Sequence, residues 1–141
     1  MALVQNKKIG LEYSIDKKII FGVELFGSEV KSLKKSQGSL DGAKVVVVGG
    51  ELNLVGAYIP LYQEKNNKGL DAYRTRKLLA NKKEILDLKN LQHGNNLHIF
   101  PISFFLQKNL IKLECGIGKR LKKQDKREVI RKKDSQRKDL E

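Results

Sequence analysis

Basic side chains are the residues of this sequence whose type and spacing could do chemistry. Of the 141 residues, 29 are Lys or Arg and 16 are Asp or Glu, which gives a formal net charge of +13. Such a surplus binds phosphate oxygens, so a polyanion, and above all a nucleic acid, is the expected partner. The basic residues gather at Lys7-Lys8, between residues 74 and 83, and from residue 118 onward.

The middle cluster contains Arg74 and Arg76, two residues apart. In an extended segment, side chains two positions apart lie on the same side, so both guanidinium groups could hold neighbouring phosphates with paired hydrogen bonds. Asn81 follows and could contact a base edge or a sugar hydroxyl. It could equally cap a helix, and the two roles are compatible. Few aromatic residues fall outside strands that look buried, so recognition should depend on phosphates and shape.

The last cluster, residues 118–141, contains 11 basic residues against five acidic ones, and only four are Leu, Val or Ile. That apolar surface is too small to offset the roughly 1–2 kcal/mol per residue that backbone ordering costs. We therefore expect a folded body over residues 1–117 and a basic C-terminal tail over 118–141, disordered when free. The tail is rich in helix-forming residues and could become helical on an anionic surface, although a purely solubilising tail has a similar composition.

Catalytic and metal-binding groupings are not evident. His93 stands at an expected helix end and His98 in an expected strand, and neither has neighbours that suggest a triad or a ligand pair. The only cysteine, Cys115, alternates with polar residues and should be a buried apolar residue. The run Gly116–Lys119 lacks the spacing of a phosphate loop. We expect no catalytic residue, no metal and no cofactor, and hence no enzyme.

The elements that must position these residues are mainly strands. Gly49-Gly50 separates two apolar runs, which is typical of a hairpin, and residues 107–109 separate another two. Two helices are expected, one capped by Ser28 and ending near Gly38, the other beginning at Asn81 and ending at His93-Gly94. The expected strands cover residues 11–15, 18–25, 44–48, 51–59, 97–106 and 110–117. The pattern favours a mainly β fold, an OB-like closed antiparallel barrel of about six strands with flanking helices.

The expected environment is a reducing cytoplasm. One cysteine excludes a disulfide framework, and no apolar run approaches the ~20 residues of a membrane span. The N-terminus lacks the apolar stretch of a signal sequence. We expect a cytoplasmic monomer without a membrane partner.

Four blocks of the sequence together indicate a family. They are 6–8 with Glu12-Tyr13, then 27–34, 71–79 and 125–128. In these blocks and their spacing the chain resembles the SsrA-binding protein family (small protein B, SmpB), from residue 6 to about 134. It departs from the family pattern at Ile20, Ala72, Arg120, Leu121 and Gln124, and at Gln124 the family's usual aromatic ring or imidazole is missing.

The resemblance implies a fold and a role. Members have an OB-like barrel of six strands, three helices and a basic tail, and they are not enzymes. They bind the tRNA-like domain of transfer-messenger RNA and deliver it to the A site of stalled ribosomes. Their tail occupies the empty mRNA channel and becomes helical there, which permits tagging of the nascent chain and ribosome rescue. The family's RNA-binding positions match Asn6, Lys7, Arg76, Lys77, Leu79 and Asn81 here, and Lys126 and Arg127 match its tail motif.

The expected sites therefore divide into two sets. For RNA binding by the body they are Asn6, Lys7, Lys8, Arg74, Arg76, Lys77, Leu79 and Asn81. For the ribosome and its mRNA channel they are Lys119, Arg120, Lys122, Lys123, Asp125, Lys126, Arg127, Arg131, Lys132 and Lys133. The alternative to a rescue factor is a ribosomal-protein-like OB module whose tail threads through rRNA.

Overall fold

A computed structural model describes residues 2–61, 71–95 and 97–121. Its seven strands form one antiparallel sheet in the order β1-β6-β7-β2-β5-β4-β3. The strands are β1 (Ala2–Gln5), β2 (Lys17–Val23), β3 (Lys44–Val48), β4 (Glu51–Val55), β5 (Arg76–Leu79), β6 (His98–Gln107) and β7 (Leu110–Gly118). The helices are α1 (Ile9–Glu12), α2 (Gly27–Lys34) and α3 (Lys82–Asn95).

Both predicted hairpins are confirmed. Gly49 and Gly50 join β3 to β4 with positive φ angles of 58° and 77°, which glycine adopts without a steric penalty. Lys108 and Asn109 join β6 to β7, also with positive φ. Because the turns set the register, apolar side chains of each strand pair reach the same side of the sheet.

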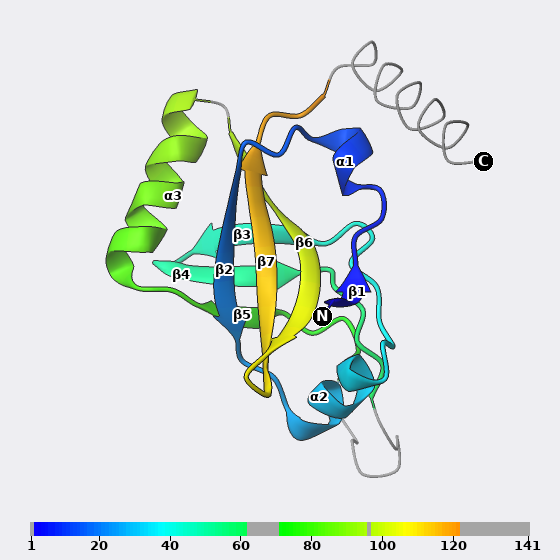
Figure 1. Ribbon diagram of the computed structural model, residues 1–141. Coiled ribbons are helices and arrows are strands. Elements are labelled where there is room, and N and C mark those ends of the chain that lie inside the picture. The colour runs from blue at the N-terminus through cyan, green and yellow to red at the C-terminus, as the bar shows by residue number, and fades with distance from the viewer. Residues whose placement is uncertain (1, 62–70, 96, 122–141) are drawn as a thin grey trace, which may run out of the picture.

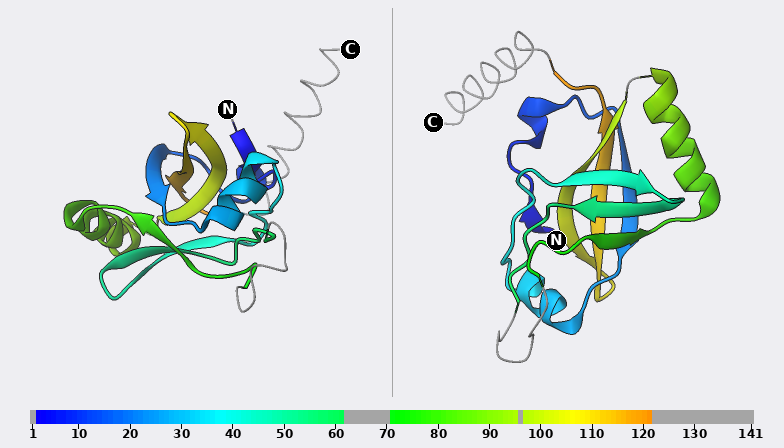
Figure 2. Two further views of the ribbon diagram at one scale, coloured as in Figure 1. Left: turned by 90° about the horizontal axis from the view of Figure 1, so that it is seen from below. Right: turned by 180° about the vertical axis from the view of Figure 1, so that it is seen from behind.

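The sheet bends back on itself, so that β2, β6 and β7 cross β3, β4 and β5 (Figures 1 and 2). The core lies between these two halves. Its most buried side chains, each with at most 2% of its surface exposed, include Phe21, Leu52, Leu54, Leu78, Phe104 and Leu113. Helix α3 lies along one side of the bent sheet, and α1 and β1 lie on the opposite side.

The expected mainly β, antiparallel fold is confirmed, but the expected closure into a barrel is wrong. The sheet has seven strands, and its edge strands β1 and β3 do not pair with each other. The additional strands, β1 and β5, are each only four residues long, too short to show a distinct alternation. Strand β5 exists because β2 and β4 hydrogen-bond to it from both sides. The fold is therefore a strongly bent, open, mainly β sheet.

Two local expectations also change. Residues 11–15 do not form a strand: Ile9–Glu12 is one helical turn with Ile9 buried, and Tyr13 makes a single bridge to Arg120. Helix α2 starts after Phe26, and Ser28 lies inside it. Its first turn is closed by Glu29, whose carboxylate accepts a hydrogen bond from the Phe26 backbone N–H at 2.8 Å.

The predicted boundary at residue 117/118 falls inside ordered structure. Gly118 belongs to β7, and the chain continues beside residues 12–14. The Ser14 N–H donates to the Lys119 carbonyl at 2.9 Å, and the Leu121 N–H donates to the Glu12 carbonyl at 2.8 Å. The contacts of the body thus continue at least as far as Leu121, the last residue of this described range. The tail predicted to be disordered covers residues 118–141, of which residues 122–141 lie outside the described residues. No helix of the described part is both long and apolar enough to cross a membrane.

Candidate nucleic-acid interface

Arg76 is the most deeply buried charged residue of the predicted interface, with none of its surface exposed. Its Nε and one terminal nitrogen donate to Glu29 Oε2 at 2.9 and 2.6 Å. The same nitrogen donates to the Ala72 carbonyl at 2.9 Å, and the other donates to the Ala57 carbonyl at 2.7 Å. Every nitrogen of the guanidinium is therefore bonded within the protein, which is what a buried charge requires.

Arg74 completes the cluster from the same side of the chain. Its terminal nitrogen lies 2.6 Å from Glu29 Oε1, and its guanidinium lies 4.4 Å from the centre of the Phe26 ring. About a quarter of its side chain is exposed. The two arginines thus do project to one side, as their spacing predicted, but that side faces a buried carboxylate.

Burial and pairing act in opposite directions on the carboxylate. Burial raises the pKa of Glu29, but hydrogen bonds from Arg74, from the Phe26 backbone N–H and from Arg76 outweigh it, and the pKa falls below its ordinary value. Burial also lowers the pKa of Arg76, against the opposing effect of Glu29. The cluster is a charged structural unit that ties α2 to the start of β5.

A side chain with no exposed surface cannot reach a phosphate. In this structure the guanidinium of Arg76 is fully buried and bonded to protein groups, so it is not placed to contact a phosphate as it stands. Asn6 is in a similar situation, with 9% of its surface exposed. Its side-chain amide nitrogen donates to the Pro101 carbonyl at 3.1 Å and fastens the residue after β1 to β6.

The outward positions of β5 and the start of α3 form an exposed surface, called here the β5–α3 surface. It consists of Lys77, Leu79, Asn81 and Lys82, which line one groove of about 570 Å³. Lys77 and Leu79 point outward because they alternate with buried Arg76 and Leu78. Leu79 leaves 52% of its surface exposed, and Lys77 Nζ lies 3.3 Å from Glu51.

Asn81 performs the capping role that the sequence suggested. Its Oδ1 accepts a hydrogen bond from the Glu84 backbone N–H at 2.7 Å, and the Glu84 carboxylate accepts one from the Asn81 backbone N–H at 3.2 Å. This reciprocal pair fixes the first turn of α3. Asn81 is also exposed, so the cap leaves part of the residue on the β5–α3 surface.

The N-terminal lysines lie elsewhere. Lys7 and Lys8 are exposed and precede α1, on the side of the molecule opposite α3 (Figures 1 and 2). Exposed Lys119 and Arg120 lie near them, because residues 119–121 follow residues 12–14. Among the described residues, exposed basic side chains therefore lie on two sides of the body: Lys77 and Lys82 on the β5–α3 surface, and Lys7, Lys8, Lys119 and Arg120 on the side of α1. The other predicted tail residues, from Lys122 to Lys133, lie outside the described residues.

Comparison with known proteins decides the family. The family model described as SmpB protein matches residues 3–140 of the chain. The chain belongs to the SmpB family. The SsrA-binding protein of Borreliella afzelii is 41% identical over 138 residues, covering 98% of this chain and 91% of that protein. The SsrA-binding protein of Mycoplasma mycoides subsp. mycoides SC is 37% identical, covering 98% and 94%.

The fold of this SmpB-family chain also matches a solved structure. A chain from the structure described as "tmRNA-SmpB: a journey to the center of the bacterial ribosome" superposes with a TM-score of 0.71 and 27% sequence identity. The match covers 93% of this chain and 96% of that one. The resemblance stated from the sequence blocks is therefore confirmed.

The cysteine and the two histidines of this SmpB-family chain, which could in principle serve catalysis or metal binding, lie in the folded body. Cys115 is fully buried, and burial, with a smaller contribution from the Glu114 charge, raises the pKa of its thiol. His98 packs against Tyr13 with ring centres 5.6 Å apart, and His93 lies in the last turn of α3. Within residues 2–61, 71–95 and 97–121, no three His, Cys, Asp or Glu residues are placed to hold a metal ion.

Glu29 is the residue of the Arg74–Arg76 cluster that sequence reasoning missed. A signal was present, because a carboxylate in the first turn of a short helix is typical of a residue that closes that turn. Lys82 was noted as basic but was not assigned to the site, and its place beside Lys77 and Asn81 depends on the turn from β5 into α3.

Proposed function

We propose that this protein binds the tRNA-like domain of transfer-messenger RNA and delivers it to the A site of stalled ribosomes. The observation that carries the proposal is the SmpB family match over residues 3–140, which includes both the body and the basic C-terminal residues. The names of its relatives and of the solved structure agree with this role.

In this proposal the predicted contact residues have different tasks, according to their burial and position. Lys77, Leu79 and Asn81 would contact the tRNA-like domain from the β5–α3 surface, together with Lys82, since all four are accessible in one groove. Arg76, Arg74 and Asn6 would hold the surfaces in place through their internal bonds. Lys7 and Lys8 would contact RNA from the opposite side of the body.

The basic C-terminal residues would serve the ribosome. A channel lined by rRNA phosphates attracts a cationic segment, and this attraction weakens as salt rises. In this proposal the mRNA channel is occupied by residues from Lys122 onward, while Lys119 and Arg120 stay with the body. Tagging and rescue would follow only where no mRNA fills the channel.

Sequencing the RNA that co-purifies with the protein tests the proposal against the ribosomal-protein alternative. One dominant tRNA-like species is the expected result. Ribosomal RNAs recovered in fixed stoichiometry with the protein would instead identify a structural subunit and overturn the proposal.

The β5–α3 surface is tested with Lys77→Ala, using binding of the isolated tRNA-like domain at several salt concentrations. Loss of one phosphate contact should weaken binding and reduce the slope of log K against log salt by about 0.7–0.9. Lys34→Ala, which removes an exposed charge at the end of α2, is the control and should leave the slope unchanged. Equal slopes for both variants would remove Lys77 from the interface.

A further inference from the structure

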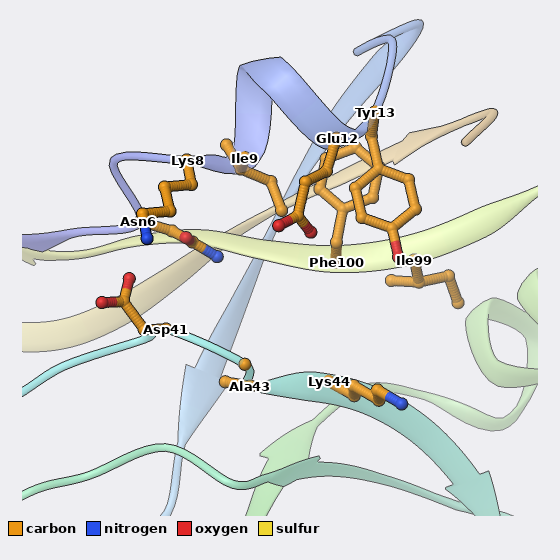
Figure 3. Close-up of a pocket in the computed structure, with 11 residues that line it drawn as sticks. Asn6, Lys8, Ile9, Glu12, Tyr13, Asp41, Ala43, Lys44, Ile99 and Phe100 are labelled. Atoms are coloured by element: carbon orange, nitrogen blue, oxygen red, sulfur yellow. The ribbon is translucent and has the colours of Figure 1, made fainter. Parts of the chain in front are cut away.

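A cavity of about 240 Å³ lies on the side of the body opposite the β5–α3 surface, between α1, β6 and the loop that enters β3 (Figure 3). The residues of its wall that matter here are Asn6, Lys8, Glu12, Tyr13, Asp41, Lys44 and Phe100. Three segments distant in sequence meet here. The lining combines charged and polar side chains with apolar and aromatic ones, so a bound group would meet both stacking surfaces and hydrogen-bonding partners.

One wall of the cavity is aromatic. The Tyr13 ring stacks on Phe100 with centres 4.5 Å apart and 19° between the planes. Phe100 is only 2% exposed, whereas Tyr13 is partly exposed and is the accessible ring of the pair. A flat, rigid ring backed by a second ring suits stacking with a nucleobase, and single-stranded RNA is commonly recognised in this way.

Two carboxylates, which accept hydrogen bonds, and two lysines line the cavity. The Glu12 side chain points from α1 into the space that Asn6 also faces (Figure 3), and Asp41 lies across from it. Neither carboxylate forms an ion pair with a described residue. Asn6 is held by its bonds to Pro101 and Ile102, so its orientation is fixed before any ligand arrives.

The chemistry of the bases selects among possible occupants. A carboxylate only accepts hydrogen bonds, and its two oxygens match two adjacent donors. Guanine presents two adjacent donors, N1–H and the N2 amine, on its Watson–Crick edge, whereas adenine, cytosine and uracil each place an acceptor beside their donor. Exposed Lys8 and Lys44 stand at the rim, where they can neutralise the phosphates that flank a base.

We propose that this cavity binds an unpaired guanine of an RNA strand, with Glu12 accepting from N1–H and the N2 amine and Tyr13 stacking on the base. Lys8 and Lys44 hold the adjoining phosphates. The inference rests on the proposed RNA binding and adds a base-selective site to it. Because the Glu12 carbonyl also accepts the Leu121 N–H, the site adjoins the point where the chain leaves the described body.

The test measures binding of the full-length protein to pentaribonucleotides that differ only in the central base, placed between uridines, at one salt concentration. We expect the guanine pentamer to bind about tenfold more tightly than the adenine pentamer, since a good bidentate pair provides discrimination of this order. Non-specific attraction by the basic C-terminal residues is equal for all pentamers and cancels in the ratio. Equal affinities would overturn the proposal.

Two substitutions test whether Glu12 is responsible for the preference for guanine over adenine. Glu12→Gln keeps the size of the side chain but replaces one acceptor by a donor, so the preference for guanine should fall to about twofold or less. Glu24→Gln removes the same charge from an exposed position outside the cavity and should retain the tenfold preference. A Glu12→Gln protein that retains the full preference would refute the assigned role.

Modified pentamers make the test independent of any variant. Replacing the central guanine by inosine removes the N2 amine, and replacing it by 1-methylguanine removes the N1 donor. Both should bind no better than the adenine pentamer if the carboxylate reads this edge. Undiminished binding of 1-methylguanine contradicts the proposal, as does binding of free GMP as tight as that of the pentamer, since an RNA strand adds phosphate contacts.

Failure of this inference is distinguishable from failure of the proposed function. The pentamer ratios report on the cavity, while the salt slope of the Lys77→Ala variant reports on the β5–α3 surface. A guanine preference without binding of the tRNA-like domain supports the cavity alone. Normal binding of the domain without a guanine preference overturns the cavity alone.

Discussion

At the residue scale, Glu29 and Arg76 illustrate how a charged pair is accommodated in a core. Both side chains have 1% or less of their surface exposed, and their shortest contact is 2.6 Å. Arg suits this position better than Lys, because its planar fork donates to Glu29, Ala57 and Ala72 at once. Such a pair contributes little net stability compared with apolar residues, but the loss of one partner leaves a buried charge without compensation.

Glu29→Gln should therefore destabilise the protein at neutral pH, by about 3–5 kcal/mol. Its effect should also depend on pH. The pKa of Glu29 in the folded protein is below the ordinary 4.5, so its stabilising contribution is complete above 4.5 and disappears as pH falls through the lower folded value. Chemical denaturation between pH 7 and pH 3 measures both effects.

The wild-type protein should accordingly lose more stability on acidification than Glu29→Gln does. Glu51→Gln is the matched control, since Glu51 pairs with Lys77 on the surface and is about half exposed. It should cost less than about 1 kcal/mol at pH 7. Parallel acid-induced losses in the wild type and in Glu29→Gln would exclude the carboxylate of Glu29 as the titrating group.

At the element scale, the end of β7 explains how the chain passes from body to tail. Gly118 lies against Ser14, and a Cβ atom at this position would overlap the Ser14 carbonyl oxygen. The close approach allows the Ser14 N–H to reach the Lys119 carbonyl, and the Lys119 N–H to reach Ser14 Oγ at 3.1 Å. A residue with a side chain at 118 would hold the two segments apart.

Gly118→Ala should thus break the pairing of residues 119–121 with residues 12–14 and destabilise the fold by about 1–3 kcal/mol. Hydrogen exchange provides the local measurement, because the Leu121 amide proton should lose its protection. Gly10→Ala is the control, since a Cβ at Gly10 meets no atom within 4 Å. Full protection of the Leu121 amide in Gly118→Ala would show that the strand end tolerates the methyl group.

At the scale of the whole molecule, the pairing of residues 119–121 with residues 12–14 joins the last described residues to the folded body. A chain that ends at Leu121 retains every described hydrogen bond, whereas one that ends at Gly118 loses the bonds from Lys119 and Leu121 to residues 12–14. Each such bond contributes about 0.5–1.5 kcal/mol.

We expect the chain ending at Leu121 to melt at the same temperature as the full chain, and the chain ending at Gly118 to melt several degrees lower. Thermal unfolding followed by circular dichroism measures the difference. If both shortened chains melted together with the full chain, residues 119–121 would not stabilise the body. If both melted lower, residues beyond Leu121 would contribute to its stability.

The fold also places the basic residues of the body on two different sides. The β5–α3 surface and the lysines near α1 lie on opposite sides of the bent sheet (Figures 1 and 2). If both surfaces bind RNA as proposed, neither requires the other, and the two would hold different RNAs or different parts of one RNA. This separation is the reason that the cavity near Glu12 and the groove near Lys77 can be tested independently.

Local sequence was sufficient for some features of the fold and the site. The two hairpins followed from the glycines at 49 and 50 and the polar turn at 107–109, because turn geometry depends on adjacent residues. The Asn81 cap followed from the Glu three positions later, and burial of Cys115 followed from alternation along its strand. The four sequence blocks were also enough to identify the SmpB family, because both their residues and their order and spacing along the chain match it.

The alternation of residues along a strand does not determine what each face of the strand contacts, and here the tertiary structure decided it. The spacing of Arg74 and Arg76 determined that they share a side, but whether that side meets solvent or the core depended on Glu29, which lies 45 and 47 residues away. The same holds for closure of the sheet, which depends on where β1 and β3 lie, and for the cavity, whose walls come from three segments. A local pattern specifies the orientation of a side chain relative to its neighbours, whereas its environment is set by contacts between segments that only the folded chain brings together.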